Sequence, residues 1–140
     1  MKKHHALPSC ERDRLETHLH RFLMDQENVL FAFLHGSFLD HDLPFGDIDV
    51  AVFFRHNPKD PVRAILDLKE TLESGINFAY EIDVQMLNGA SLGFRFHASR
   101  GTVLACKDQE ALDTFRQETW LRYWDCEPFL RQSLTYLLEP

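Results

Sequence analysis

Residues 29–54 read VLFAFLHGSFLDHDLPFGDIDVAVFF, and this stretch contains two strand patterns separated by a polar segment. Residues 29–34 form a continuous apolar run, which is typical of a strand buried on both faces, and the run stops at the turn His35-Gly36-Ser37. Residues 47–54 alternate polar and apolar side chains before they become wholly apolar. The stretch therefore predicts two strands, of which the first ends in Gly-Ser and the second begins in Asp-Ile-Asp.

Helix and strand patterns alternate along the rest of the chain, without a Gly/Ser/Pro-rich linker or an internal repeat. This order predicts one domain of the α/β (α+β) class over residues 1–140. Pro128 is expected to break or kink the last helix. Besides the two strands, the predicted elements are helices over 9–25, 60–75, 88–99 and from 108 onward, and strands over 80–87 and 102–106.

Composition narrows the class of protein. The chain has 140 residues, 44% of them hydrophobic and twelve of them Phe, which excludes a disordered chain. No apolar run approaches the length of a membrane-spanning helix. With 22 Asp and Glu against 15 Lys and Arg, the net charge of -7 argues against strong nucleic-acid binding through a broad basic face.

The cysteines and the N-terminal segment bear on location. Cys10, Cys106 and Cys126 are odd in number and widely spaced, so they predict neither a disulfide framework nor a zinc site. Residues 1–10 have no apolar core and are not expected to be a secretory signal. Both observations favour a cytoplasmic protein.

The acidic pair of the second strand is the first candidate for chemistry. Asp47 and Asp49 are two residues apart on a strand, so their side chains project to one face, roughly 6 to 7 Å apart along the backbone. At an effective dielectric constant near 20, two carboxylates at that separation repel each other by about 2 to 3 kcal/mol. A divalent cation relieves this repulsion, and hard oxygen ligands suit magnesium, which substrate phosphates usually complete.

Two further polar elements accompany this pair. Gly36 lets the backbone approach a ligand closely, and the hydroxyl of Ser37 with the N–H groups that follow can point at phosphate oxygens. Asp83 lies on the alternating strand 80–87, and three carboxylates converge if this strand pairs with the second one. Glu81 shares a face with Asp83 and is the rival for the third position.

Gly36-Ser37, nine intervening residues, Asp47-Ile48-Asp49 and the later Asp83 together resemble the nucleotidyltransferase superfamily that includes DNA polymerase beta. By its size the chain resembles the minimal nucleotidyltransferases, or MNT proteins. The resemblance covers most of the chain. It implies the nucleotidyltransferase fold, a small mixed β-sheet of about four strands flanked by helices, in a single MNT domain over residues 1–140.

The resemblance also implies a reaction. A nucleoside monophosphate is transferred from a triphosphate such as ATP to an acceptor hydroxyl, with two Mg²⁺ ions. By this resemblance Asp47 and Asp49 hold the metals, and Asp83 binds the metal nearer the acceptor and helps to deprotonate it. Gly36 and Ser37 bind the outer phosphates.

A partner protein is implied in the same way. Many MNT proteins are antitoxins that silence a HEPN-type ribonuclease toxin by adding AMP to a tyrosine. In this chain almost no residues remain to build an acceptor-binding domain, so the acceptor is expected to dock from outside. The helix from 108 is expected to pack on the sheet through Phe115, Trp120, Tyr123 and Trp124, and its end after Pro128 is a candidate partner surface.

The chain departs from the family in residues 38–40, Phe-Leu-Asp, and at Gly46, where many relatives have Arg and Ser respectively. Arg55, Arg95 and Arg100 are candidates to supply the missing positive charge. Two alternatives stay open, the first of them because of this departure. The protein could be a catalytically weak antitoxin that acts by complex formation alone, or an adenylyltransferase with a small-molecule acceptor.

Overall fold

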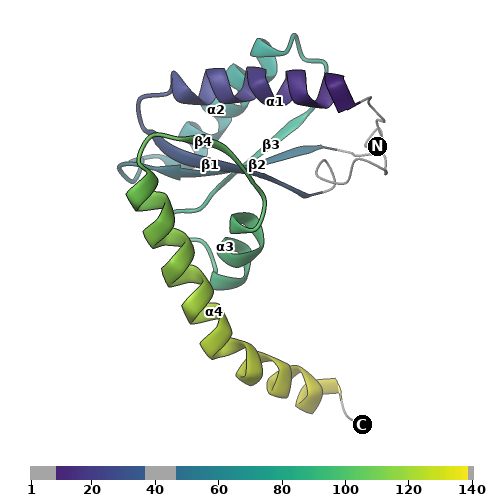
Figure 1. The fold of residues 1–140 in the computed structure, drawn as a ribbon, viewed down its shortest axis with the longest axis vertical. Helices are drawn as coiled ribbons and strands as arrows, with labels where there is room; N and C mark the ends of the chain where they lie inside the picture. Colours follow the sequence, from purple (N-terminus) through teal and green to yellow (C-terminus); the bar gives the residue numbers. More distant parts are fainter. Residues whose placement is uncertain (1–8, 37–46, 139–140) are drawn as a thin grey trace.

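The computed structural model describes the backbone of residues 9–36 and 47–138, and the side chains of residues 10–36 and 47–126. Helices and strands alternate along the described backbone (Figure 1). The elements are α1 (Ser9–Met24), β1 (Val29–His35), β2 (Ile48–Phe54), α2 (Pro61–Gly75), β3 (Ile82–Met86), α3 (Leu92–Ser99), β4 (Thr102–Cys106) and α4 (Gln109–Leu138).

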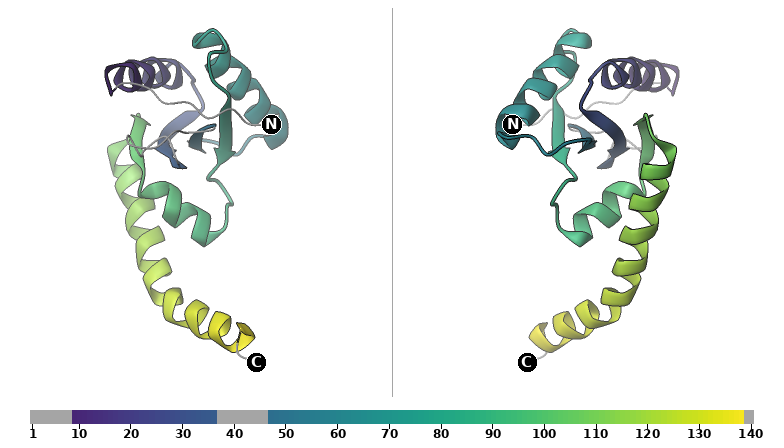
Figure 2. Two further views of the ribbon diagram at one scale, coloured as in Figure 1. Left: turned by 90° about the vertical axis from the view of Figure 1, so that its right-hand side faces the viewer. Right: turned by 90° about the vertical axis from the view of Figure 1, so that its left-hand side faces the viewer.

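The strands form one mixed sheet in the order β3-β2-β1-β4. β1 pairs antiparallel with β2 and with β4, whereas β2 and β3 are parallel. Figure 2 shows α1 and α2 on one side of the sheet and α3 with α4 on the other. The structure confirms the predicted mixed sheet of about four strands flanked by helices.

The sheet is buried on both faces in its centre, as the apolar run of β1 predicts. On the face that α1 and α2 cover, one apolar cluster includes side chains from all four strands. On the opposite face, the rings of Phe31, Phe33 and Phe53 lie against Phe115 of α4. The start of α4 therefore packs on the sheet through an aromatic cluster.

Helix α2 shows why one glycine is needed. The helix starts behind Asp60, whose side chain caps it by accepting a hydrogen bond from the backbone N–H of Arg63 in the first turn. It ends at Gly75, where an added Cβ would come within 2.4 Å of the ring of Phe22. Gly75 thus permits the close approach of α1, and the left-handed residues that turn the chain are Asn77 and Phe78.

Several predicted boundaries shift. β2 begins at Ile48, so Asp47 lies in the bend that precedes the strand. β3 spans Ile82–Met86 and is shorter than residues 80–87. α3 begins at Leu92, because the hydroxyl of Ser91 caps its first turn.

Helix α4 shows one of the two outcomes expected at Pro128 and corrects the expected packing of its aromatic residues. It continues through Pro128 without a break, and Figure 1 shows that it changes direction toward its C-terminal end, away from the sheet. Phe115 is buried, but Trp120 and Trp124 are 38% and 63% exposed, so their placement in the core is wrong. Tyr123 stacks on Phe96 of α3. The sheet ends before the helix does, and the later turns therefore have no strand to cover.

Within residues 9–36 and 47–138, every helix is too short or too polar to span a membrane.

Candidate active site

Three polar residues form a row across neighbouring strands. His35 at the end of β1 is the register partner of Asp49 on β2, and Asp49 is the register partner of Asp83 on β3. Their side chains project to the sheet face that α3 and α4 cover, since Ile48, Val50 and Ile82 belong to the cluster on the other face. The strand of Asp83 is therefore the neighbour of the strand of Asp49, which meets the condition for their carboxylates to lie on one face.

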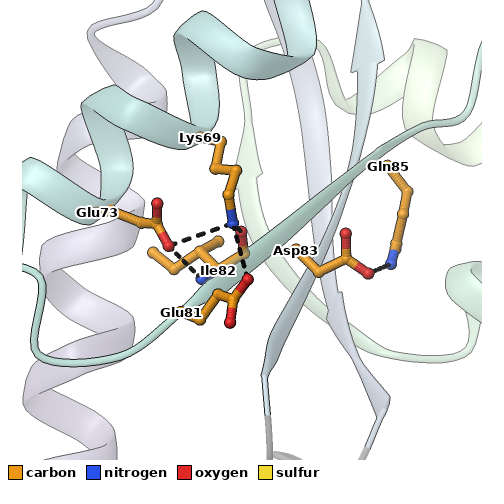
Figure 3. A network of polar contacts seen from close by, with 6 residues as sticks. All are labelled: Lys69, Glu73, Glu81, Ile82, Asp83 and Gln85. Atoms are coloured by element: carbon orange, nitrogen blue, oxygen red, sulfur yellow. Dashed lines mark hydrogen bonds and ion pairs between the residues drawn. The ribbon is translucent and has the colours of Figure 1, made fainter. Parts of the chain in front are cut away.

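Gln85 connects this row. Its side-chain nitrogen donates to Oδ1 of Asp49 at 3.2 Å and to Oδ2 of Asp83 at 2.7 Å. Its Oε1 lies 2.7 Å from Nε2 of His35. Figure 3 shows Gln85 and Asp83 turned toward each other on the same strand. The sequence motif includes neither Gln85 nor His35, although the alternation of strand 80–87 already places Gln85 on the face of Asp83.

Gly36 lies against the second oxygen of Asp49. Its φ is +82°, and a Cβ added there would come within 2.2 Å of Asp49 Oδ2. A side chain at position 36 would be strained by the backbone and would also displace the carboxylate. The turn after β1 thus meets the acidic strand directly. Ser37, the other predicted phosphate ligand, lies outside the described residues, as do residues 38–40 and Gly46.

The electrostatics of Asp49 reflect its surroundings. Burial raises the pKa of Asp49 above its ordinary value of 3.8, and the negative charges of Asp83 and Asp47 raise it further. The hydrogen bond from Gln85 and the charge of His35 lower this pKa in part. Asp47 therefore acts on Asp49 electrostatically from the bend before β2. A cation among these carboxylates would stabilise their charged forms.

Glu81 is held away from this row. Its carboxylate lies 3.7 Å from Nζ of Lys69 on α2, and Figure 3 shows it turned toward that lysine. Lys69 also donates to the carbonyl of Ile82 at 2.6 Å, and Glu73 accepts from the N–H of Ile82 at 2.9 Å. These contacts fix the start of β3 on α2. The structure brings Asp83, and not Glu81, opposite Asp49.

The donor set fits a divalent cation that a substrate completes. In the described part of the chain, no group of three or more His, Cys, Asp or Glu side chains is arranged to hold a metal by itself. Gln85 occupies one oxygen of Asp49 and one of Asp83, and the second oxygen of each carboxylate can face a cation. Magnesium commonly binds to one or two carboxylates and takes its other ligands from water and phosphate. Hard oxygen donors of this kind suit Mg²⁺ better than a soft metal.

A cavity of about 370 Å³ adjoins the row at the end of β1. Among the three candidate arginines, only Arg100 lines it. The side chain of Arg95 donates to the carbonyl of Leu87, and Arg55 follows the opposite end of β2. The lining residues are His35, Gly36, His97, Arg100 and Gly101.

The family of the chain follows from a direct match. Residues 17–110 match the family model described as polymerase beta, nucleotidyltransferase. This range contains the whole sheet and Gly36, Asp47, Asp49 and Asp83. The chain belongs to this nucleotidyltransferase family. Comparison with the curated proteins finds no match.

Solved structures share the fold over nearly the whole chain. One is a tri-AMPylated Shewanella oneidensis HEPN toxin in complex with an MNT antitoxin, with a TM-score of 0.70, 18% identity, and 91% of this chain and 99% of that chain covered. The toxin-antitoxin MntA-HepT has a TM-score of 0.69 at 18% identity, covering 91% and 99%. A toxin-antitoxin with AMP-PNP has a TM-score of 0.71 at 19% identity, covering 89% and 98%.

Proposed function

We propose that this protein transfers AMP from ATP to a hydroxyl of a HEPN-type toxin and thereby acts as the antitoxin of that toxin. The observation that carries the proposal is the register of Asp49 opposite Asp83, with Gly36 against Asp49, in a sheet of the nucleotidyltransferase family. The structural relatives support the partner and the nucleotide, because their complexes include an AMPylated HEPN toxin and AMP-PNP.

In this proposal the carboxylates would hold two Mg²⁺ ions. Asp47 and Asp49 would hold the ions, and Asp83 would hold the one nearer the acceptor. When bound, the ions neutralise charge on the attacking and leaving oxygens of the reaction. Gly36 and Ser37 bind the outer phosphates of the nucleotide through their backbone N–H groups and the hydroxyl.

The proposed reaction is an in-line displacement at the α-phosphorus. The acceptor oxygen forms a bond to the α-phosphorus, the bond from this atom to the oxygen bridging to the β-phosphorus breaks, and pyrophosphate leaves. The proton of the acceptor hydroxyl moves to the carboxylate of Asp83, which acts as general base. Asp83 is exposed at the edge strand of the sheet, where an acceptor can reach it from solvent.

The nucleotide is proposed to lie at the other end of the row. Asp83 is on the edge strand β3, whereas the cavity of about 370 Å³ adjoins β1 on the far side of Asp49. Arg100 of this cavity supplies positive charge of the kind that a triphosphate attracts, and a ring nitrogen of His97, which also lines it, can donate a hydrogen bond. Arg100 thus takes the part of the arginine that residues 38–40 lack.

The partner is proposed to bind the projecting part of α4. Trp120 and Trp124 are exposed large aromatic side chains on this helix, and such side chains often anchor protein interfaces. Residues 1–140 act as a single MNT domain in this proposal. The cytoplasm is its proposed location, which the free state of Cys10, Cys106 and Cys126 supports.

Label transfer tests the proposal. The protein is incubated with Mg²⁺, ATP labelled at the α-phosphate and the product of the adjacent reading frame, and the partner is expected to take up label. A partner that is silenced without label would show the alternative of complex formation alone. Label found on added small molecules, and not on the partner, would show the other alternative.

A further inference from the structure

We propose that Gln85 is a positioning residue for the metal-binding carboxylates, and that His35 fixes the orientation of Gln85. The inference rests on the proposed role of Asp49 and Asp83 as metal ligands. It concerns two side chains that the sequence motif of the family does not include.

Hydrogen-bond chemistry permits one orientation of the Gln85 amide. Ionised carboxylates are acceptors only, so the amide nitrogen, which has two N–H donors, must face Asp49 and Asp83. The amide oxygen must then face His35, and Nε2 of His35 must carry a proton to donate to it. Each N–H of the amide thus has one carboxylate, and the amide cannot turn over without placing its oxygen against two carboxylates.

The contacts also select which carboxylate oxygens face the cation. Gln85 takes Oδ1 of Asp49 and Oδ2 of Asp83. Oδ2 of Asp49 lies against Gly36, at the end of β1 where the nucleotide cavity begins. Each carboxylate group is thereby held in one orientation, with its second oxygen available to a cation. Outer partners of this kind orient metal ligands in many proteins, and their loss commonly weakens metal binding about 10- to 100-fold.

A purely structural role for Gln85 is disfavoured by the other contacts of β3. The main chain of Ile82 is already bound to the side chains of Lys69 and Glu73. At the far end of the strand, the N–H of Leu87 donates to the carbonyl of Val52 at 2.8 Å. The strand is therefore attached at both ends without Gln85. Among the described residues, the side-chain hydrogen bonds of Gln85 go to His35, Asp49 and Asp83 alone.

Manganese binding provides a test that does not depend on catalysis. Mn²⁺ is titrated into metal-free protein with saturating AMP-PNP, and free Mn²⁺ is followed by electron paramagnetic resonance. Gln85→Met keeps the length of the side chain and removes its donors, and we expect the Kd for Mn²⁺ to rise about 10-fold. Gln109→Met on α4 is the matched control, and its Kd and unfolding temperature should equal those of the wild type. Gln85→Met should keep the wild-type unfolding temperature.

Variants of His35 provide a second, independent test by Mn²⁺ binding, which applies even if Gln85→Met fails to fold. His35→Leu removes the donor to Gln85, whereas His35→Gln places an amide nitrogen near the position of Nε2. We expect His35→Leu to weaken Mn²⁺ binding several-fold and His35→Gln to restore it. Equal affinity in these two variants, or wild-type affinity in Gln85→Met, overturns the inference. Wild-type affinity in Asp49→Asn would instead overturn the proposed metal site itself.

Discussion

Asp49 of β2 lies directly opposite Asp83 of the parallel strand β3, and the amide of Gln85 donates a hydrogen bond to both carboxylates. Two acidic side chains in register on neighbouring strands repel each other and destabilise a sheet. Their presence in a family of nucleotidyltransferases supports a role in binding cations.

Because Asp83 and not Glu81 lies opposite Asp49, we expect substitutions at these two positions to differ in their effect on kcat. Asp83→Asn removes the proposed general base, and we expect kcat for AMP transfer to fall by about 10² to 10⁴, with little change in KM for ATP. Glu81→Gln changes a carboxylate that faces Lys69, and its kcat should stay within about twofold of the wild type. Steady-state kinetics with labelled ATP measure both. Equal losses in the two variants would contradict the assignment.

The contact of Gly36 with Asp49 is tested by comparison with a second glycine that has a similar backbone conformation. Gly36 and Gly89 both have positive φ, +82° and +72°, so alanine is strained at either position. Only at position 36 does the added Cβ meet Asp49, because nothing lies within 4 Å of one at position 89. We expect both alanine variants to lose about 1 kcal/mol of stability in urea unfolding.

Activity should separate these two glycines. Gly36→Ala is expected to lower AMP transfer at least about 10-fold through displacement of Asp49, the proposed metal ligand. Gly89→Ala should retain wild-type kcat. Unchanged activity in Gly36→Ala would show that the contact with Asp49 has no part in the reaction.

The raised pKa of Asp49 predicts that ionisation of this side chain lowers the stability of the metal-free protein. Because the folded pKa exceeds the ordinary value of 3.8, the neutral acid favours folding. This contribution is full below the ordinary value and is lost as pH rises through the raised value. At pH 7 Asp49→Asn, which stays neutral, should therefore unfold at a higher temperature than the wild type without metal.

When ligand is present, the wild type and not Asp49→Asn should have the higher unfolding temperature. Mg²⁺ with AMP-PNP should raise the unfolding temperature of the wild type, because ligands that bind the folded state stabilise it. Asp49→Asn should show no such rise. Scanning calorimetry over pH 4.5 to about 8 would follow both effects, and the advantage of Asn at position 49 should shrink toward the acidic end. A metal-free variant less stable than wild type would contradict the expectation.

The exposed aromatics of α4 predict a partner surface. The double variant Trp120→Ala with Trp124→Ala should weaken the complex with the partner by about 2 kcal/mol or more, which is roughly 30-fold in Kd. Leu66→Ala on α2 also truncates an exposed apolar side chain, 54% exposed, and should leave Kd unchanged. Biolayer interferometry with the immobilised partner measures both. An unchanged Kd in the double variant would place the partner elsewhere.

Local sequence patterns predicted the parts of the site that depend on one strand at a time. The apolar run of β1, the Asp-x-Asp at the start of β2 and the alternation around Asp83 each identify a face. The roles of Gln85 and His35 depend on the register between strands, which single strands do not encode. For this reason the structure was needed to find them.

The same limit explains the error at α4. The aromatic residues of this helix predict an apolar side, but whether a strand lies beneath it depends on how far the sheet extends. The sheet covers Phe115 and not Trp124. At Gly75 the sequence correctly predicted the end of α2, but the packing of Phe22 is a tertiary contact that no local pattern contains.

Position-specific labelling of ATP tests whether the carboxylate pair catalyses transfer of AMP to a partner protein. The wild type and Asp49→Asn are incubated with Mg²⁺, the partner, and ATP labelled at either the α- or the γ-phosphate. We expect the wild type to transfer label to the partner from α-labelled ATP only, and Asp49→Asn to transfer none. Transfer from γ-labelled ATP, or equal transfer by both proteins, would contradict the account.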